Sequence, residues 1–312
     1  MNPSPEDQAF VSVVVPCFNG MKTIGDCLSS LADQTYSRDR FEVLLVDNGS
    51  RDGTCEFVQA SFPWVRLVHC SEKGSGYARN AGIREARGEL LLSTDSDCVA
   101  DKSWIAQLVT LFQQAPPEVA AIGGIIRPFS TRTAVEKYKR TWVGQPNANG
   151  KEPGVRYTAT PNAAFRTSII RLVGSFDGAL GFDDTDLGIR LIKAGYQIQY
   201  TDLAIVYHRN PASLAELYQH KSKYGKFGFD LARKHPEVLG QSTLGDELRK
   251  LRVASARRVL GNLLVRLPVS LVAGSADAPR VWPLIDAVIA VANYKGFSRA
   301  ATHARNQGQG GS

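Results

Sequence analysis

The sequence has no uninterrupted run of 18 apolar residues, so we expect no conventional membrane-spanning helix. It has five cysteines and no C-x-x-C pair, which fits neither a zinc ribbon nor a framework of disulfides. No internal repeat is visible. The first eight residues include Glu6 and Asp7 with no apolar stretch behind them, so we expect no secretory signal. These absences predict a cytoplasmic chain with reduced thiols.

What the sequence does contain is ordinary for a globular protein. Its 312 residues are 43% hydrophobic and 21% charged, enough for one large α/β domain or a domain with an appendage. The net charge of +7 is unevenly placed, because residues 205–312 hold 16 Lys and Arg against 7 Asp and Glu. Residues 1–204 hold 21 against 23. The basic last third therefore suggests a polyanionic partner, either nucleic acid or an anionic membrane surface.

Short apolar runs alternate with stretches of helical spacing in the first half of the chain. The runs lie at residues 11–15, 42–46, 65–70, 89–93 and 119–125, and the helical stretches lie at residues 22–34, 53–60, 75–86 and 102–114. This alternation predicts a parallel sheet covered by helices. A further helix is expected to start near Asp183 and end at Gly195, and a strand around residues 203–207 then leads to His208.

The remaining segments read as loop and helix. Residues 127–157 are rich in Gly, Pro and Asn, which predicts a long loop beside a short helix. The chain beyond residue 210 reads as helical and basic, ending in a flexible tail. Its two apolar patches, residues 259–273 and 281–294, are too broken to cross a bilayer but could lie in its interface.

Acidic residues follow two of the predicted strands. Asp47 ends the second apolar run, and Asp95 and Asp97 follow the fourth. Ligands bind at the carboxyl ends of strands in open α/β sheets, and two close carboxylates raise each other's pKa unless a cation compensates. Mg²⁺ or Mn²⁺ would meet that need. The alternative is a turn in which Asp95 and Asp97 only cap the next helix.

The stretch GSGYARNAG, residues 74–82, begins like a dinucleotide-binding fingerprint, but Arg79 stands where the last glycine belongs. A helix N-terminus with an arginine one turn in would suit a diphosphate. The alternative is a plain strand-to-helix turn with a surface arginine.

Taken in order, five motifs resemble those of family 2 glycosyltransferases with the GT-A fold. They are VSVVVPCFN, DNGSRDGT, GSGYARNAGIREARGELLLSTDSDC, TPNAAFR and FDGALGFDDTDLGIRLIKAGY, spread over about residues 11–210. The resemblance implies an α/β fold with a GT-A type, Rossmann-like, mostly parallel sheet flanked by helices, plus a helical C-terminal extension. It also implies an inverting transferase that uses a nucleotide-sugar donor, a UDP, GDP or dTDP sugar, with Mg²⁺ or Mn²⁺. Residues 1–210 would form the catalytic domain and residues 211–312 the basic extension.

The resemblance assigns four residues to the nucleotide. Pro16 would line its pocket, Asp47 would meet the nucleobase, and Arg79 would face the nucleotide. Asp95, the first carboxylate of the D-x-D motif, would lie near the ribose. One departure from the family pattern is Asn48, which replaces the common second Asp of the nucleotide motif.

The resemblance also implies a metal site and a base. Asp97 would hold the metal, with His208 as a further ligand, and Asp184 of the Asp183-Asp184 pair would be the catalytic base. The alternatives are a helix cap for Asp184 and an ordinary strand-end histidine for His208. The Q-x-x-R-W segment of processive synthases is absent, which argues against a polysaccharide synthase.

Three other functions compete with the transferase. A nicotinamide oxidoreductase would need a glycine at position 79, and a non-catalytic nucleotide-binding or scaffold protein would not need intact carboxylates. A nucleic-acid binder is suggested only by the basic tail, and we expect no specific nucleic acid. For the transferase we expect a glycan or lipid-linked acceptor in cell-surface glycan or glycolipid biosynthesis. We expect it in the cytoplasm, with the tail able to dock peripherally on the inner face of an anionic membrane, and the sequence leaves an oligomer open.

Overall fold

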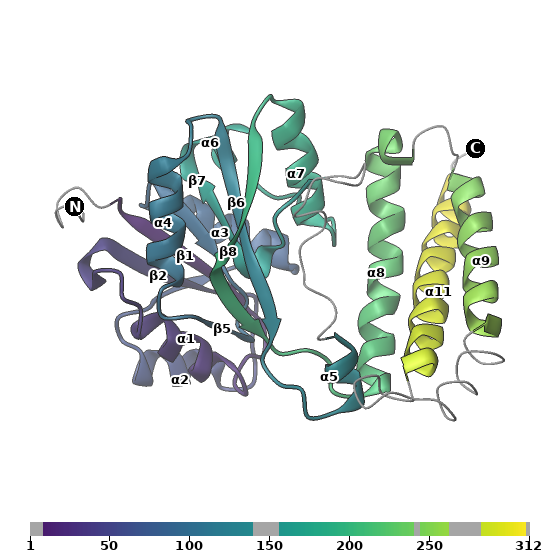
Figure 1. The fold of residues 1–312 in the computed structure, drawn as a ribbon, viewed down its shortest axis with the longest axis horizontal. Helices are drawn as coiled ribbons and strands as arrows, with labels where there is room; N and C mark the ends of the chain where they lie inside the picture. The colour runs from purple at the N-terminus through teal and green to yellow at the C-terminus, as the bar shows by residue number, and fades with distance from the viewer. Residues whose placement is uncertain (1–8, 140–155, 240–243, 262–281, 310–312) are drawn as a thin grey trace. The chain divides into compact units, whose positions relative to one another are not determined.

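The computed structural model describes residues 9–139, 156–239, 244–261 and 282–309 (Figure 1). The chain divides into two compact units. The first contains the chain up to Phe129 with residues 143–179 and 183–209, and the second contains residues 130–142, 180–182 and 210 onward. Parts of the sequence predictions lie outside the described residues: residues 140–155 of the loop, residues 262–273 and 281 of the two apolar patches, and residues 310–312 of the tail.

The first unit is built on one mixed eight-stranded sheet. Its strands are β1 (Val11–Cys17), β2 (Phe41–Asp47), β3 (Arg66–His69), β4 (Leu90–Ser93), β5 (Cys98–Ala100), β6 (Val119–Pro128), β7 (Ala163–Arg166) and β8 (Gln197–His208). Their order is β3-β2-β1-β4-β7-β6-β8-β5. The strands β3, β2, β1 and β4 are mutually parallel, and so are β6 and β8. The antiparallel strand β7 joins these two groups, and β5 pairs antiparallel with the end of β8 at the sheet edge.

Helices cover both faces of this sheet (Figure 1). They are α1 (Ile24–Ala32), α2 (Thr54–Ser61), α3 (Ser75–Glu85), α4 (Trp104–Gln114), α6 (Thr167–Leu172) and α7 (Asp183–Lys193). On one face Val11, Val13 and Val15 pack with α1, α2 and α4. On the other face Val14 packs with α3, α6 and α7. Because β1 is buried on both faces, its sequence is a continuous apolar run instead of an alternating one.

Two glycines shape these helices, Gly82 by close packing and Gly195 by its backbone conformation. A Cβ at Gly82 would lie 2.5 Å from Cγ1 of Val14, so α3 can rest directly on β1. Gly195 has a φ of +85°, and the N–H groups of Gly195 and Tyr196 bond to the carbonyls of Ile192 and Leu191. This is a Schellman motif, and it confirms the predicted end of the helix at Gly195.

The second unit is helical. Its helices are α5 (Ala134–Lys139), α8 (Leu214–Lys234), α9 (Leu244–Gly261) and α11 (Trp282–Gln309). Short 3₁₀ turns complete the chain at Arg38–Arg40, Thr160–Asn162 and Pro236–Leu239. Gly225 of α8 and Gly296 of α11 each face the backbone of the other helix with no room for a Cβ, so these helices pack backbone to backbone. Within the described residues, no helix combines the length and apolar character that crossing a bilayer requires.

Candidate active site

Asp47 lies where β2 ends, and its carboxylate is held by the loop that follows. Oδ1 accepts the N–H of Ser50 at 3.0 Å, and Oδ2 accepts the N–H of Gly49 at 3.2 Å. Burial alone would raise the pKa of Asp47, but hydrogen bonds from Ser50 and Gly49 outweigh it and leave the pKa below its ordinary value. Pro16 is buried in β1, beside Val46 in the neighbouring strand. Asp47 therefore presents an ionised acceptor at the carboxyl edge of the sheet.

The loop after β1 is tied to the loop after β2. The N–H of Asn19 donates to Ser50 Oγ at 2.9 Å, and Asn19 Oδ1 accepts the N–H of Arg51 at 2.9 Å. Asn19 has a φ of +52°, in the left-handed region, and these bonds help to hold it there. The neighbouring Phe18 side chain is 61% exposed on this fixed backbone. The two loops thus form a firm rim beside Asp47.

The contacts of Asn48 give a structural reason for its departure from the family pattern. Its Nδ2 donates to the carbonyls of Cys70, at 3.1 Å, and Glu72, at 2.7 Å, while its Oδ1 accepts the N–H of Gly74 at 2.8 Å. Only an amide can donate and accept in this way. Asn48 therefore anchors the segment that leads from β3 into α3.

The glycines of the GSG segment serve packing. Gly74 has a φ of +142°, and a Cβ at Gly76 would lie 2.9 Å from both Asp183 Oδ2 and the Cα of Gly178. The first turn of α3 is therefore held against the chain that leads into α7. Because backbone conformation accounts for Gly74 and packing accounts for Gly76, the two glycines give no support to a nicotinamide-binding loop.

Arg79 joins two acidic segments of the site. Its side chain is buried, with Nη1 3.1 Å from Asp183 Oδ2 and Nη2 2.8 Å from Asp95 Oδ1. Burial alone would lower the pKa of Arg79, but Asp183 and Asp95 outweigh it and raise the pKa. Nε is buried with no hydrogen-bond partner among the described residues. No local pattern marks Asp183 as the partner of Arg79, although a buried arginine needs carboxylate partners.

Asp184 follows Asp183 in the first turn of α7. Its Oδ1 accepts the N–H of Thr185 at 2.7 Å, and its own N–H donates to Asp183 Oδ1 at 2.9 Å. An N-cap side chain would accept from a residue two or three positions further on, so Asp184 does not cap the helix in the usual way. Burial, followed by the charge of Asp183, raises the pKa of Asp184 to about 7. A carboxylate of that pKa is suited to accept a proton near neutral pH.

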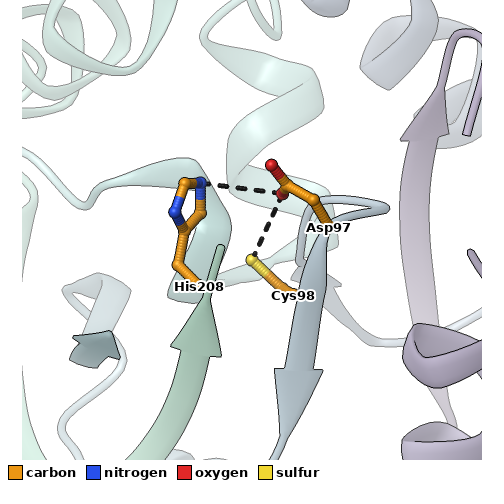
Figure 2. Close-up of side chains that lie close together, drawn as sticks. All are labelled: Asp97, Cys98 and His208. Atoms are coloured by element: carbon orange, nitrogen blue, oxygen red, sulfur yellow. Dashed lines mark hydrogen bonds and ion pairs between the residues drawn. The ribbon is translucent and has the colours of Figure 1, made fainter. Parts of the chain in front are cut away.

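Asp97 and His208 face each other across the β5–β8 pair (Figure 2). His208 Nε2 lies 3.6 Å from Asp97 Oδ1, and the Cys98 thiol donates to the same oxygen at 3.8 Å. Burial raises the pKa of Asp97, the charge of His208 opposes this, and Asp95 adds to it. Burial also raises the pKa of the Cys98 thiol, so the sulfur stays protonated.

The three residues form a group that could hold a metal ion, since their ligand atoms all lie within 4.8 Å of one another. A carboxylate and an imidazole suit Mg²⁺ or Mn²⁺, whereas a soft sulfur ligand does not. A cation would also offset the burial that raises the pKa of Asp97. Asp97 and His208 therefore fit a divalent cation, with Cys98 as a hydrogen-bond donor to the carboxylate. Cys98 was not predicted as part of this group, although it stands next to Asp97 in the sequence.

The α/β sheet and the acidic residues at its carboxyl edge are consistent with a nucleotide-binding enzyme, and comparison with known families identifies the class. The sequence model of "Glycosyl transferase family 2" matches residues 12–174, more than half of the chain. The chain belongs to this family, and it is a glycosyltransferase. Membership of this family does not favour the alternative, a non-catalytic nucleotide-binding or scaffold protein.

Curated relatives agree with this assignment. Glycosyltransferase AglE of Haloferax volcanii is 31% identical over 225 residues, which cover 70% of this chain and 72% of that protein. The pre-mycofactocin glycosyltransferase of Mycobacterium tuberculosis is 28% identical over 247 residues, covering 75% of this chain and 50% of that protein. The chain thus spans only half the length of the second relative.

Solved structures share the fold. The mannosyltransferase PcManGT from Pyrobaculum calidifontis, in complex with GDP-Man and Mn²⁺, superposes with a TM-score of 0.61 at 22% identity over 95% of this chain and 89% of that one. S. aureus TarS residues 1–349 with UDP-GlcNAc gives a TM-score of 0.52 at 17% identity over 94% and 92%. The predicted α/β, GT-A type fold is confirmed.

Proposed function

We propose that the chain moves a sugar from a nucleotide-sugar donor to an acceptor hydroxyl with inversion, in the assembly of a cell-surface glycan or glycolipid. The observation that carries this is the pair of ion pairs at Arg79, which connects Asp95 of the D-x-D motif with Asp183 beside Asp184. The donor side and the acceptor side of a transfer reaction meet at this residue.

The donor would bind at the carboxyl edge of β1, β2 and β4. Asp47 would accept an N–H of the nucleobase, Pro16 would line the pocket, and Asp95 would lie near the ribose. Asp97 and His208 would hold Mg²⁺ or Mn²⁺, which as a Lewis acid would neutralise the charge that grows on the leaving diphosphate. The guanidinium of Arg79 adds a fixed positive charge to the same region, and its unpartnered Nε supports a further ligand contact there.

Asp184 would be the base. Its half-buried carboxylate, with a pKa raised to about 7, would take the proton of the acceptor hydroxyl as that oxygen attacks the anomeric carbon. A single attack from the face opposite the leaving group inverts the anomeric centre. Thr185 steadies one carboxylate oxygen, which leaves the other to receive the proton.

The donor belongs to the UDP, GDP or dTDP sugars. GDP-Man and UDP-GlcNAc are bound by the two structural neighbours named above, at identities that support the fold and not the base. Three nucleoside diphosphates therefore have to be compared directly on this chain. The acceptor would be a glycan or a lipid-linked saccharide.

The second unit supports a place at the cytoplasmic side of an anionic membrane. Helix α9 exposes Arg252, Arg257 and Arg258 together with the apolar side chains of Val253 and Leu260, which are distributed around most of its circumference. A helix that exposes both cations and apolar groups can bind at the interface of an anionic bilayer. The chain would act there as a peripheral protein.

A thermal-shift comparison of UDP-, GDP- and dTDP-sugars with and without Mn²⁺ tests the proposed function, because a ligand that binds only the folded state raises its stability. We expect one nucleotide class to raise the Tm in a Mn²⁺-dependent way and Asp97→Asn to abolish the Mn²⁺ dependence. Hydrolysis or transfer of that donor by the purified chain would then identify the sugar. No stabilisation by any of the three classes would contradict the proposal.

A further inference from the structure

The side chain of Arg209 is held by two residues from distant parts of the chain. Its Nη2 ion-pairs with Asp26 of α1, and its Cζ lies 3.9 Å from the ring centre of Phe129. Its Nε is buried and has no partner among the described residues. The guanidinium is therefore fixed from two sides, although the carboxylate of Asp26 is 60% exposed.

The backbone at this point carries the proposed metal pair. Arg209 directly follows His208, and its N–H donates to the carbonyl of Asp97 at 3.2 Å. The N–H of Phe129 donates to the carbonyl of His208 at 2.9 Å. The placement of the His208 imidazole against Asp97 thus depends on how residues 208 and 209 are held.

The first turn of α1 also contacts the D-x-D segment, which carries Asp97, the other residue of the proposed metal pair. The thiol of Cys27, next to Asp26, donates to the carbonyl of Asp95 at 3.6 Å. Burial raises the pKa of Cys27, so the thiol remains a donor. The first turn of α1 therefore contacts the D-x-D segment through Cys27 and the end of β8 through Asp26.

We propose that Asp26, Arg209 and Phe129 are positioning residues that hold His208 at the separation from Asp97 that a divalent cation needs. The proposal rests on the proposed metal site and adds three residues to it that make no contact with the ion. Groups that orient a metal ligand from outside typically set metal affinity by about 10- to 100-fold. An ion pair this exposed contributes little to folding, so its loss should leave the chain folded.

The variant Arg209→Gln distinguishes two explanations, because they predict opposite changes in the affinity for Mn²⁺. If Arg209 acted only through its charge, removing a cation beside a cation site would tighten Mn²⁺ binding. If it positions His208, Mn²⁺ binding weakens, by up to about tenfold. The measurement is the EPR signal of free Mn²⁺ during titration, with Mn²⁺ alone and with UDP, GDP or dTDP at fixed concentration.

Two further variants complete the set. Phe129→Leu removes the ring beneath the guanidinium without changing charge, and it should weaken Mn²⁺ binding in the same direction. Lys102→Gln is the matched control, because it removes one positive charge from an exposed ion pair with Asp33 at the other end of α1. It should leave Mn²⁺ affinity unchanged, and all three Tm values should stay within about 3 °C of the parent chain.

Pulsed EPR of bound Mn²⁺ supplies a second readout, since modulation from the imidazole nitrogen should be present in the parent chain and reduced in Arg209→Gln. Affinity for Mn²⁺ that is equal or tighter in Arg209→Gln would overturn the positioning role. If Asp97→Asn also binds Mn²⁺ normally, or the parent chain binds none, the metal site itself fails and the positioning role fails with it. If Asp97→Asn loses Mn²⁺ while Arg209→Gln keeps it, only the positioning role is wrong.

Discussion

At the scale of single residues, the most unusual group in the site is the carboxyl of Asp184. Its pKa is raised from 3.8 to about 7, first by burial and then by the charge of Asp183. As the proposed base, Asp184 is expected to govern the pH dependence of the transfer rate, and its raised pKa makes it one contributor to the pH dependence of stability.

For the rate, Asp184→Asn should lower transfer by about 10²- to 10⁴-fold while leaving donor affinity unchanged, because the amide cannot accept a proton. In the parent chain, kcat should rise about tenfold per pH unit below pH 7 and level off above it. Steady-state rates from pH 5 to 9, with donor Kd by calorimetry, check both statements. Near-normal turnover in the variant would remove Asp184 as the base.

The direction in which pH changes the stability of the fold follows from whether the folded or the unfolded chain binds the proton of Asp184. Between about pH 4 and about pH 7 the folded chain keeps a proton on Asp184 that the unfolded chain releases, so this contribution is full at low pH and is lost as pH rises through about 7. Asp184→Asn should therefore have a higher Tm than the parent chain at pH 8 and the same Tm near pH 4. An equal or lower Tm of Asp184→Asn at pH 8 would show that the ionised carboxylate of Asp184 does not destabilise the folded chain.

Asn48 offers a different kind of test, because a single atom separates it from the residue that is common in the family. In Asn48→Asp the group at Nδ2 becomes an oxygen facing the carbonyls of Cys70 and Glu72, and both donor bonds are lost. The loss should lower the free energy of unfolding by about 1–3 kcal/mol, measured by urea denaturation at pH 8. Asn48→Asp of unchanged stability would mean that the segment before α3 is held by other contacts.

At the scale of elements, the contact between the start of α3 and the chain before α7 brings Arg79 and Asp183 together. Gly76→Ala would push a Cβ to 2.9 Å from Asp183 Oδ2 and the Cα of Gly178, which should lower stability by about 1–3 kcal/mol and reduce transfer. Thermal unfolding and transfer rates of the variant measure the two effects.

The control for this substitution is Gly25→Ala in α1. A Cβ there meets only the ring of Phe57 at 3.5 Å, an ordinary contact. Alanine is favoured over glycine within a helix, so Gly25→Ala should raise stability by about 0.5–1 kcal/mol. Destabilisation of the same size in both variants would show that helix α3 is not specially close-packed.

The sequence predicted the elements whose pattern is local. The runs at 11–15 and 42–46 are strands β1 and β2, and the helix from Asp183 ends at Gly195 as expected. Strand β5 was not predicted because it has only three residues, and β7, with the sequence AAFR, was not predicted because it lacks the Val and Leu residues that mark β3 and β4. The polar residues Thr201 and Asp202 interrupt the apolar pattern of β8. The sequence therefore predicted a strand only around residues 203–207.

In the candidate site, too, residues in local motifs could be predicted, whereas contacts between distant residues could not. The D-x-D carboxylates, the acidic pair and His208 could be named from motifs, because each motif is continuous in sequence. The ion pair between Arg79 and Asp183 joins residues 104 positions apart, and nothing local marks it. The bond from Cys27 to Asp95 and the contacts of Arg209 are likewise products of the tertiary fold.

At the scale of the whole molecule, the uneven charge of the chain coincides with its division into two units. We expect the full-length chain to float with anionic vesicles at low salt and to be released at high salt. Replacing Arg252, Arg257 and Arg258 by Gln should weaken vesicle binding by about 100-fold, since each cation near such a surface contributes about 1 kcal/mol. Flotation with neutral vesicles separates the charge effect from apolar insertion.

A charge-matched control replaces Arg84, Arg87 and Lys102, three exposed cations of the first unit, by Gln. It should bind anionic vesicles almost as the parent chain does. Equal loss in both triple variants would mean that net charge alone is responsible, and no vesicle binding by the parent chain would remove the membrane from the proposal.

The edge strand β5 has one further consequence. It has three residues and pairs on one side only, with the end of β8, yet this short ladder sets Cys98 opposite His208. Cys98 and Ala100 of β5 are nevertheless buried in the core that contains α1, so packing holds this strand as well as its ladder does. The proposed metal pair therefore lies at a strand that is paired on one side, whereas the proposed nucleotide edge lies on β1 and β2, which are paired on both sides and buried on both faces. A change that loosens β5 is thus expected to affect the proposed cation site before it affects the proposed nucleobase site.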